Sequence, residues 1–162
     1  MKSDKELSLI GRAETIDLID LDLKKVPAKV DTGADISSIW VSSVRESSEG
    51  LRVIFFGKGS EHYTGREMVF PGGFSLTRVA NSFGHKEPRY KLKLRIKIND
   101  RLVRATFTLA DRSEKLYPVL LGRRLLKGKF LVDVSQGDPL HQEERKRRAR
   151  LEKELNGSKR LK

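Results

Sequence analysis

The chain contains no cysteine, which excludes disulfide bonds and thiolate metal ligands as sources of stability. Its three histidines, His62, His85 and His141, lie far apart and form no HExxH or similar metal-binding pattern. No GxxxxGK[ST] motif that would cradle phosphates is present either. The sequence therefore predicts a fold held together by packing alone, with no metal and no cofactor.

Long apolar runs are also missing. No segment approaches the length needed to span a bilayer, and the opening residues MKSDKE lack the apolar run of a signal peptide. We therefore expect a soluble, cytoplasmic protein without a membrane partner. With 162 residues, of which 37% are apolar, the chain suffices for one domain with a hydrophobic core but not for two ordinary domains. We expect this domain at residues 1–140 and a basic tail or helix at residues 141–162.

Negative charge is scarce relative to positive charge. The chain has 34 Lys and Arg against 22 Asp and Glu, which gives a formal net charge of +12. Residues 141–162 contain nine Lys or Arg and four Glu, and so carry +5 of this total. Such a surplus attracts polyanions, for example RNA or acidic protein tails, without identifying one of them.

Alternating and β-branched segments predict an all-β domain of short strands. In residues 90–98, Leu and Ile alternate with Lys and Arg, and Asn99-Asp100 supplies a turn to a returning strand at residues 102–109. We interpret these cations as the solvated face of a sheet rather than as a nucleic-acid surface. Residues 8–22 predict a strand or hairpin, and further strands are expected at residues 51–56, 67–70, 74–79, 117–122 and 130–134.

Two late segments have helical character. Residues 123–127 predict one or two helical turns after Gly122. Residues 142–155 are rich in Glu, Arg, Lys and Leu, but their only apolar residues are Ala149, Leu151 and Leu155. We therefore expect the tail to be a frayed, exposed helix or a disordered segment.

The most informative stretch is residues 28–39, with the sequence AKVDTGADISSI. Val30 ends an extended run, and Gly33 permits a tight loop two residues after Asp31. Asp31 is therefore expected at the end of a strand with its carboxylate held in place, as a catalytic acid requires. Asp, Thr and Gly are also common in surface turns, so the motif alone leaves a plain turn open.

A second motif, LLGR at residues 120–123, comes late in the chain. DTGAD at residues 31–35, followed by this motif on an all-β background, resembles the retropepsin-like aspartic peptidases. The segments FTLADR, YPVLLGR and FLVDV narrow the resemblance to bacterial and archaeal proteins named ATP-dependent zinc proteases, often encoded near ATP-grasp peptide ligases of the RimK type. The resemblance runs from about Leu9 to Ser135. That branch usually has Arg directly after Asp-Thr-Gly-Ala. This chain has Asp35 at that position, and the viral enzymes have an acidic residue there too.

The resemblance implies a retropepsin-like barrel that hydrolyses peptide bonds with two aspartates sharing one proton. Because the chain has a single Asp-Thr-Gly, it also implies a homodimer with Asp31 of each copy at the two-fold axis. Thr32 would then hydrogen-bond across the axis, and Gly33 would admit the substrate backbone beside Ala34. The substrate would be an extended peptide, such as one added by a ligase, bound as an extra β-strand.

The resemblance further implies a flap and a supporting pair of residues. Residues 67–70 and 74–79 predict a hairpin whose tip, Pro71-Gly72-Gly73, is one candidate for the flap; residues 81–85 are the other. In the viral enzymes the acidic residue after Asp-Thr-Gly-Ala faces the Arg that follows the late Gly. Asp35 and Arg123 are therefore expected to form a partly buried pair beside Gly122.

A function of another class stays open at this point. The net charge and the tail from residue 143 onward are also typical of a non-catalytic, dimeric binding module that contacts RNA or ribosomal protein. Peptide turnover that vanishes when Asp31 is replaced would favour the peptidase, whereas salt-sensitive RNA binding without turnover would favour the binding module.

Overall fold

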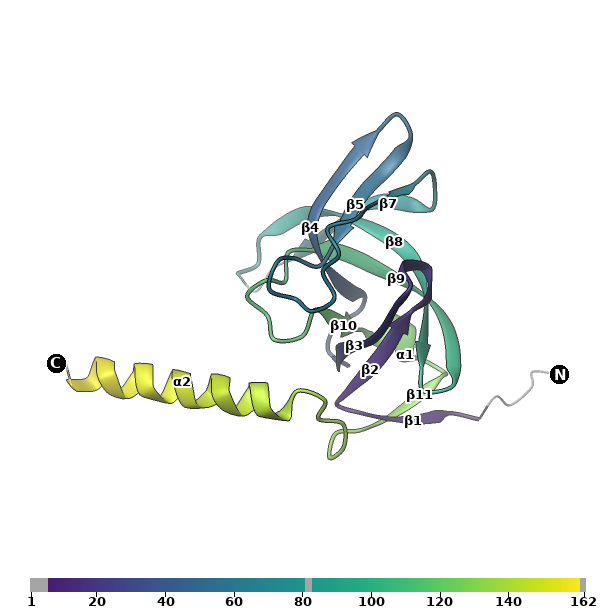
Figure 1. Ribbon diagram of the computed structural model, residues 1–162. Coiled ribbons are helices and arrows are strands. Elements are labelled where there is room, and N and C mark those ends of the chain that lie inside the picture. The colour runs from purple at the N-terminus through teal and green to yellow at the C-terminus, as the bar shows by residue number, and fades with distance from the viewer. Residues whose placement is uncertain (1–5, 81–82, 161–162) are drawn as a thin grey trace.

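The computed structural model describes residues 6–80 and 83–160. Short strands form one body, and a long helix follows at the C-terminal end (Figure 1). In chain order the elements are β1 (Ser8–Gly11), β2 (Ala13–Leu18), the 3-10 helix η1 (Ile19–Leu21), β3 (Leu23–Val30), β4 (Ser37–Ser47), β5 (Gly50–Phe55), β6 (Glu67–Phe70), β7 (Phe74–Ala80), β8 (Lys86–Ile98), β9 (Arg101–Ala110), β10 (Val119–Leu121), α1 (Arg123–Leu126), β11 (Phe130–Asp133) and α2 (His141–Arg160).

The main sheet closes on itself. Its strands follow the order β10, β3, β2, β8, β9, β4, β5, β6, and β7 pairs with β8. Because β10 also pairs with β4, the first six strands of this order form a ring. Closure of this kind removes exposed strand edges and encloses a core. The interior is filled by side chains that are almost wholly buried, among them Ile16, Val26, Leu94, Ile96 and Phe107. The predicted all-β barrel is therefore confirmed.

The hairpin of β8 and β9 follows the alternation in the sequence. Leu94 and Ile96 are buried, whereas Lys93 and Arg95 are exposed. Ile98 lies opposite Arg101, so Asn99-Asp100 forms the predicted turn. The short strand before Gly122, the helical turn after it and the final strand also form where they were expected, as β10, α1 and β11.

The predicted hairpin around Pro71-Gly72-Gly73 is wrong. β6 pairs with β5 and β7 pairs with β8, so the two segments belong to different strand pairs. The reason lies in the length of β8, which extends from Lys86 to Ile98. β2 pairs only with its last residues, from Ile96 onward, which leaves the first half of that edge free for β7. The true hairpin is β7 and β8, and its connection includes residues 81–82, which lie outside the described residues.

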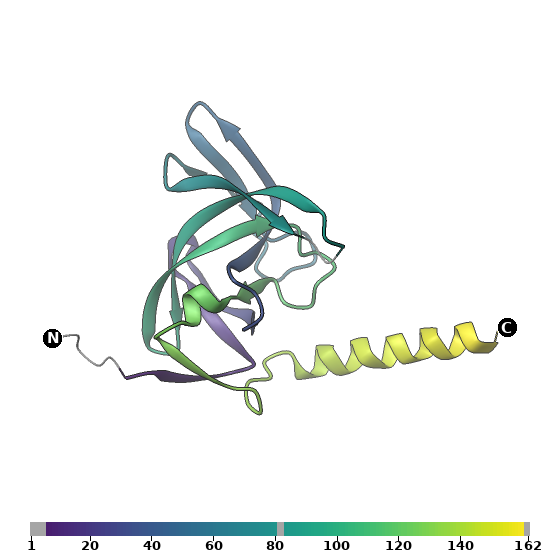
Figure 2. The same ribbon diagram turned by 180° about the vertical axis from the view of Figure 1, so that it is seen from behind.

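A small sheet and a long helix lie outside the main sheet. β1 and β11 pair in parallel and form a small sheet of their own. α2 has no buried residue, and in both views it extends away from the barrel (Figures 1 and 2). Of the two possibilities for the tail, the structure has the exposed helix. No helix in the described part of the chain is long and apolar enough to cross a membrane.

Candidate active site

Asp31 directly follows β3, as predicted. β3 and β10 pair in parallel, and the backbone N–H of Asp31 donates to the carbonyl oxygen of Leu121 at 2.9 Å. The carboxylate oxygen Oδ1 accepts hydrogen bonds from the backbone N–H of Gly33 at 2.9 Å and of Ala34 at 3.2 Å. A Cβ atom on residue 33 would lie only 3.2 Å from this oxygen, so glycine leaves room for the carboxylate. The loop therefore fixes one carboxylate oxygen through its own backbone.

The late Gly-Arg motif packs against this loop. A Cβ atom on Gly122 would lie 2.7 Å from the carbonyl carbon and oxygen of Ile36 and 3.0 Å from the carbonyl oxygen of Ala34, a space that only glycine fits. Gly122 N–H donates to Ser37 Oγ at 3.0 Å, and Arg123 N–H donates to the Ala34 carbonyl oxygen at 2.8 Å. The two sequence motifs thus form one rigid unit around Asp31.

Asp35 is paired differently from the expectation. Its nearer partner is Arg124, whose Nη2 lies 2.8 Å from Oδ2, whereas Arg123 Nη2 lies 3.9 Å from Oδ1. Arg123 instead donates from Nη1 to the carbonyl oxygen of Gly33 at 3.3 Å. All three charged side chains are more than half exposed, so the expectation of a partly buried Asp35–Arg123 pair is wrong for the single chain. α1 is a single turn at the surface, and it presents both arginines to solvent.

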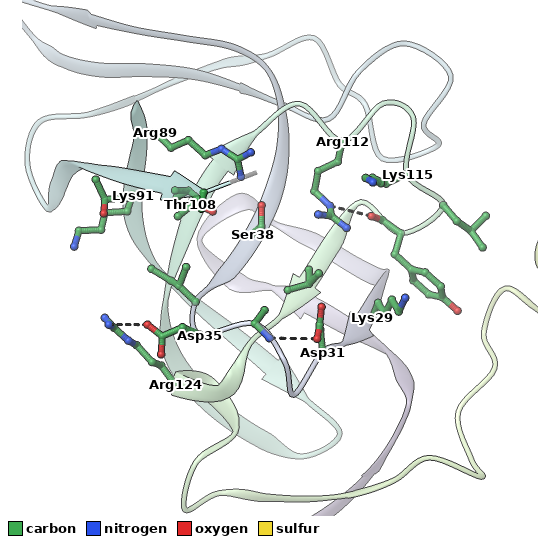
Figure 3. A pocket seen from close by; sticks show the side chains of 18 of the residues that line it. Lys29, Asp31, Asp35, Ser38, Arg89, Lys91, Thr108, Arg112, Lys115 and Arg124 are labelled. Atoms are coloured by element: carbon green, nitrogen blue, oxygen red, sulfur yellow. Dashed lines mark hydrogen bonds and ion pairs between the residues drawn. The ribbon is translucent and has the colours of Figure 1, made fainter. Parts of the chain in front are cut away.

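A cavity of about 1240 Å³ opens beside Asp31 (Figure 3). Residues 77–80 of β7 form part of its wall, whereas Pro71, Gly72 and Gly73 do not line it. Nine Lys or Arg side chains line the cavity against three acidic ones, Asp31, Asp35 and Glu144. This excess of positive charge attracts an anionic ligand.

Arg112 is a half-buried cation of this cavity. Its Nε donates to the carbonyl oxygen of Tyr117 at 3.1 Å, and it forms no ion pair with any residue that the structure describes. Burial and the nearby Arg89 lower the pKa of Arg112, while the charge of Asp31 opposes them. In Figure 3 the side chains of Arg112 and Arg89 lie above Asp31. Ser38 Oγ, which is buried at the cavity wall, has no hydrogen-bond partner among the described residues.

The start of α2 borders the same cavity. Tyr117 donates its hydroxyl proton to Glu144 Oε1 at 3.1 Å, and Arg12 Nη2 lies 3.2 Å from Glu144 Oε2. Burial, followed by the hydrogen bond to Glu144, raises the pKa of Tyr117 well above its ordinary value. Arg12 also pairs with Asp138 at 2.9 Å. These contacts attach the first turn of α2 to the rim of the cavity.

Thr32 faces another side of the loop. It is exposed, and its hydroxyl has no hydrogen-bond partner within residues 6–80 and 83–160. It lines a second hollow of about 540 Å³ together with Asp35, Arg123, Phe130 and Val132. This hollow lies between the Asp31 loop, α1 and β11.

Comparison with known proteins identifies the chain at the level of a family. Residues 9–139 match the RimB-like family, described as retropepsin-like aspartic endopeptidase RimB. The chain belongs to this family. The matched range covers the barrel and both motifs, whereas α2 lies wholly outside it.

Two relatives of this family member are informative. A protein named "Probable alpha-L-glutamate ligase" from Desulfotalea psychrophila is 24% identical over 136 residues, which cover 82% of this chain and 29% of the relative. The chain thus matches less than a third of that relative's length. A crystal structure of a protein of unknown function from Legionella pneumophila, Lpg0085, is 27% identical with a TM-score of 0.60. That alignment covers 81% of this chain and 96% of the Legionella chain.

The name of the related branch refers to zinc. Among the residues that the structure describes, no three His, Asp or Glu side chains gather in a way that could hold a metal ion.

Sequence reasoning missed the cations of the cavity. Arg89, Arg112 and Lys115 come from β8 and from the segment between β9 and β10, and the fold brings them to one place. In the sequence they are indistinguishable from the cations of the solvated sheet face. The only available signal was the net charge, which does not say where the charges gather.

Proposed function

We propose that the protein is an aspartic endopeptidase whose active site is built from two copies of the chain, each contributing Asp31. The chain supplies one fixed carboxylate per copy, whereas this chemistry requires two. A second copy related by a two-fold axis provides the other carboxylate without any further sequence motif. The match to an aspartic endopeptidase family supports this reading.

In this site one Asp31 carboxylate is ionised and the other is protonated, because two such close carboxylates do not both ionise. The ionised one accepts a proton from water, whose oxygen attacks the peptide carbonyl carbon. The protonated one donates its proton to the carbonyl oxygen. Collapse of the tetrahedral intermediate breaks the C–N bond, and the amine leaves with a proton from the dyad.

The surface around Thr32 is our candidate for the contact between copies. Thr32 is exposed beside the hollow, with its hydroxyl available to hydrogen-bond across the axis. On the neighbouring small sheet, Leu9 and Leu131 are more than half exposed, which gives a partner copy apolar area to cover. Burial of Asp35, Arg123 and Arg124 would follow only in the dimer.

We propose an acidic peptide as the substrate. The observation that carries this choice is the ratio of nine basic to three acidic side chains around the cavity, with Arg112 free of any described ion pair. A substrate carboxylate there would find guanidinium groups, which bind carboxylates by two hydrogen bonds. The name of the relative, "Probable alpha-L-glutamate ligase", supports glutamate as the acidic residue of the substrate.

The hairpin of β7 and β8 is the flap in this proposal. Residues 77–80 line the cavity that contains Asp31, so this hairpin could cover an extended peptide and exclude water. Of the two candidates for the flap tip, Pro71-Gly72-Gly73 does not line this cavity, and residues 81–85 include 81–82, which lie outside the described residues.

The test compares cleavage of three peptides of equal length, made of Glu, of Gln and of Lys, by the wild-type chain and by Asp31→Asn. We expect cleavage of the Glu peptide only, and none by Asp31→Asn, because Asn keeps the shape but cannot cycle a proton. The folded state of the variant is checked by its thermal unfolding. Absence of turnover, combined with salt-sensitive binding of RNA, would instead favour the non-catalytic binding module.

A further inference from the structure

We propose that α2 is a second, non-catalytic binding site, which holds the acidic stretch of the substrate polypeptide that extends out of the cavity. The inference rests on the proposed preference for acidic peptides. It goes beyond the family, because α2 lies outside the matched residues 9–139.

The charge on α2 is dense and poorly compensated. The helix carries eight Lys or Arg and four Glu, and residues 145–150, RKRRAR, contain five cations and no acid. Lys146 and Arg150 are one turn apart, where like charges repel. The one ion pair between described residues of this helix joins Arg150 to Glu154 at 3.7 Å. An anionic partner would relieve this repulsion.

α2 begins at the rim of the cavity, where it can bind a substrate polypeptide that extends out of the cavity. Glu144 is held by Tyr117 and Arg12, so the helix leaves the barrel from a fixed point. Glu144 and Arg147 line the cavity that contains Asp31, and the cation cluster continues outward from them. Beyond its first turn α2 extends into solvent in both views (Figures 1 and 2). Arg147 thus belongs both to the cations that line the cavity and to the cation cluster of the helix.

The length of α2 sets the length of substrate that it can engage. Its 20 residues span about 30 Å, which an extended polypeptide covers with about nine residues. RNA is less well matched to this surface, since α2 contains no Phe, Tyr or Trp on which bases could stack. The position of Arg147 in the wall of the cavity likewise favours an acidic polypeptide.

The experiment measures binding rather than cleavage, so that it does not depend on turnover. Fluorescence anisotropy follows the binding of labelled glutamate peptides of about 8 and about 20 residues to the full chain carrying Asp31→Asn. One variant adds Arg145→Gln, Lys146→Gln, Arg148→Gln and Arg150→Gln, substitutions that keep a high helix propensity. A matched control removes four exposed cations outside the cavity, with Lys24→Gln, Lys58→Gln, Arg66→Gln and Lys93→Gln. Circular dichroism confirms that α2 stays helical.

We expect the long peptide to bind about tenfold more tightly than the short one, with this advantage lost in the α2 variant and kept in the control. Equal binding of both peptides to the parent chain would overturn the inference, as would an equal loss in the α2 variant and the control. A 20-nucleotide RNA that binds, and loses affinity in the α2 variant while the long peptide does not, would assign α2 to RNA instead. Cleavage by the wild-type chain is measured separately: if it is absent while the length effect persists, the peptidase proposal fails and the binding site stands.

Discussion

Replacement of Gly122 by Ala tests whether the late motif supports the active-site loop. A Cβ atom at residue 122 would lie 2.7 Å from the carbonyl carbon and oxygen of Ile36 and 3.0 Å from the carbonyl oxygen of Ala34. These are backbone atoms, so no side-chain rotation can relieve the clash. Overpacking of this kind costs about 1 to 3 kcal/mol of folding free energy. Any relaxation must also displace the segment that holds the Asp31 carboxylate.

We therefore expect Gly122→Ala to lower the free energy of unfolding by about 1 to 3 kcal/mol in a urea titration. Cleavage of an acidic peptide, measured where the variant is still fully folded, should fall more than tenfold. Gly72→Ala is the matched control, because a Cβ there meets no atom within 4 Å. Full stability and full cleavage in Gly122→Ala would refute the close packing of the two motifs.

Three further predictions concern charges outside the dyad. Asp35 and Arg124 should show a coupling below about 1 kcal/mol in a double-mutant cycle on the monomeric chain, since both are exposed; a coupling near 3 kcal/mol would mean that the pair is buried. Burial raises the pKa of Asp20, but hydrogen bonds from the side chain and backbone of Arg95 outweigh it and lower the pKa below its ordinary value. The wild type should therefore lose this stabilisation as the pH falls below about 4, whereas Asp20→Asn should be less stable at pH 7 and show a shallower acid slope in thermal unfolding. Deletion of residues 148–162 should leave the unfolding temperature unchanged, whereas deletion from residue 141 should lower it, because Glu144 then no longer meets Tyr117.

Local patterns were sufficient to predict much of the barrel and the place of Asp31. In β8, alternation of Leu94 and Ile96 with Lys93 and Arg95 defines which face is buried, and Gly33 marks the loop after β3. Strand partners were harder to predict. β7 pairs with β8 rather than with β6 because β8 is long enough to leave part of one edge unpaired by β2. The residues around Pro71 contain no local pattern that would predict this pairing.

In the candidate site, too, local patterns predicted some features and not others. The Asp-Thr-Gly loop and its contact with Gly122 follow from short motifs and close backbone approach. Which arginine pairs with Asp35 depends on the orientation of a single helical turn, so the sequence did not distinguish Arg123 from Arg124. The convergence of Arg89 and Arg112 near Asp31 depends on tertiary structure alone.

The most direct test of a site shared by two copies is the activity of mixed subunits. Wild-type and Asp31→Asn chains are co-refolded at increasing fractions of the variant, and cleavage of the acidic peptide is measured at constant total protein. If both copies must supply Asp31, activity follows the square of the wild-type fraction and falls to about a quarter in an equal mixture. A linear decrease to about half in the equal mixture would show that each copy works alone, and would contradict the account.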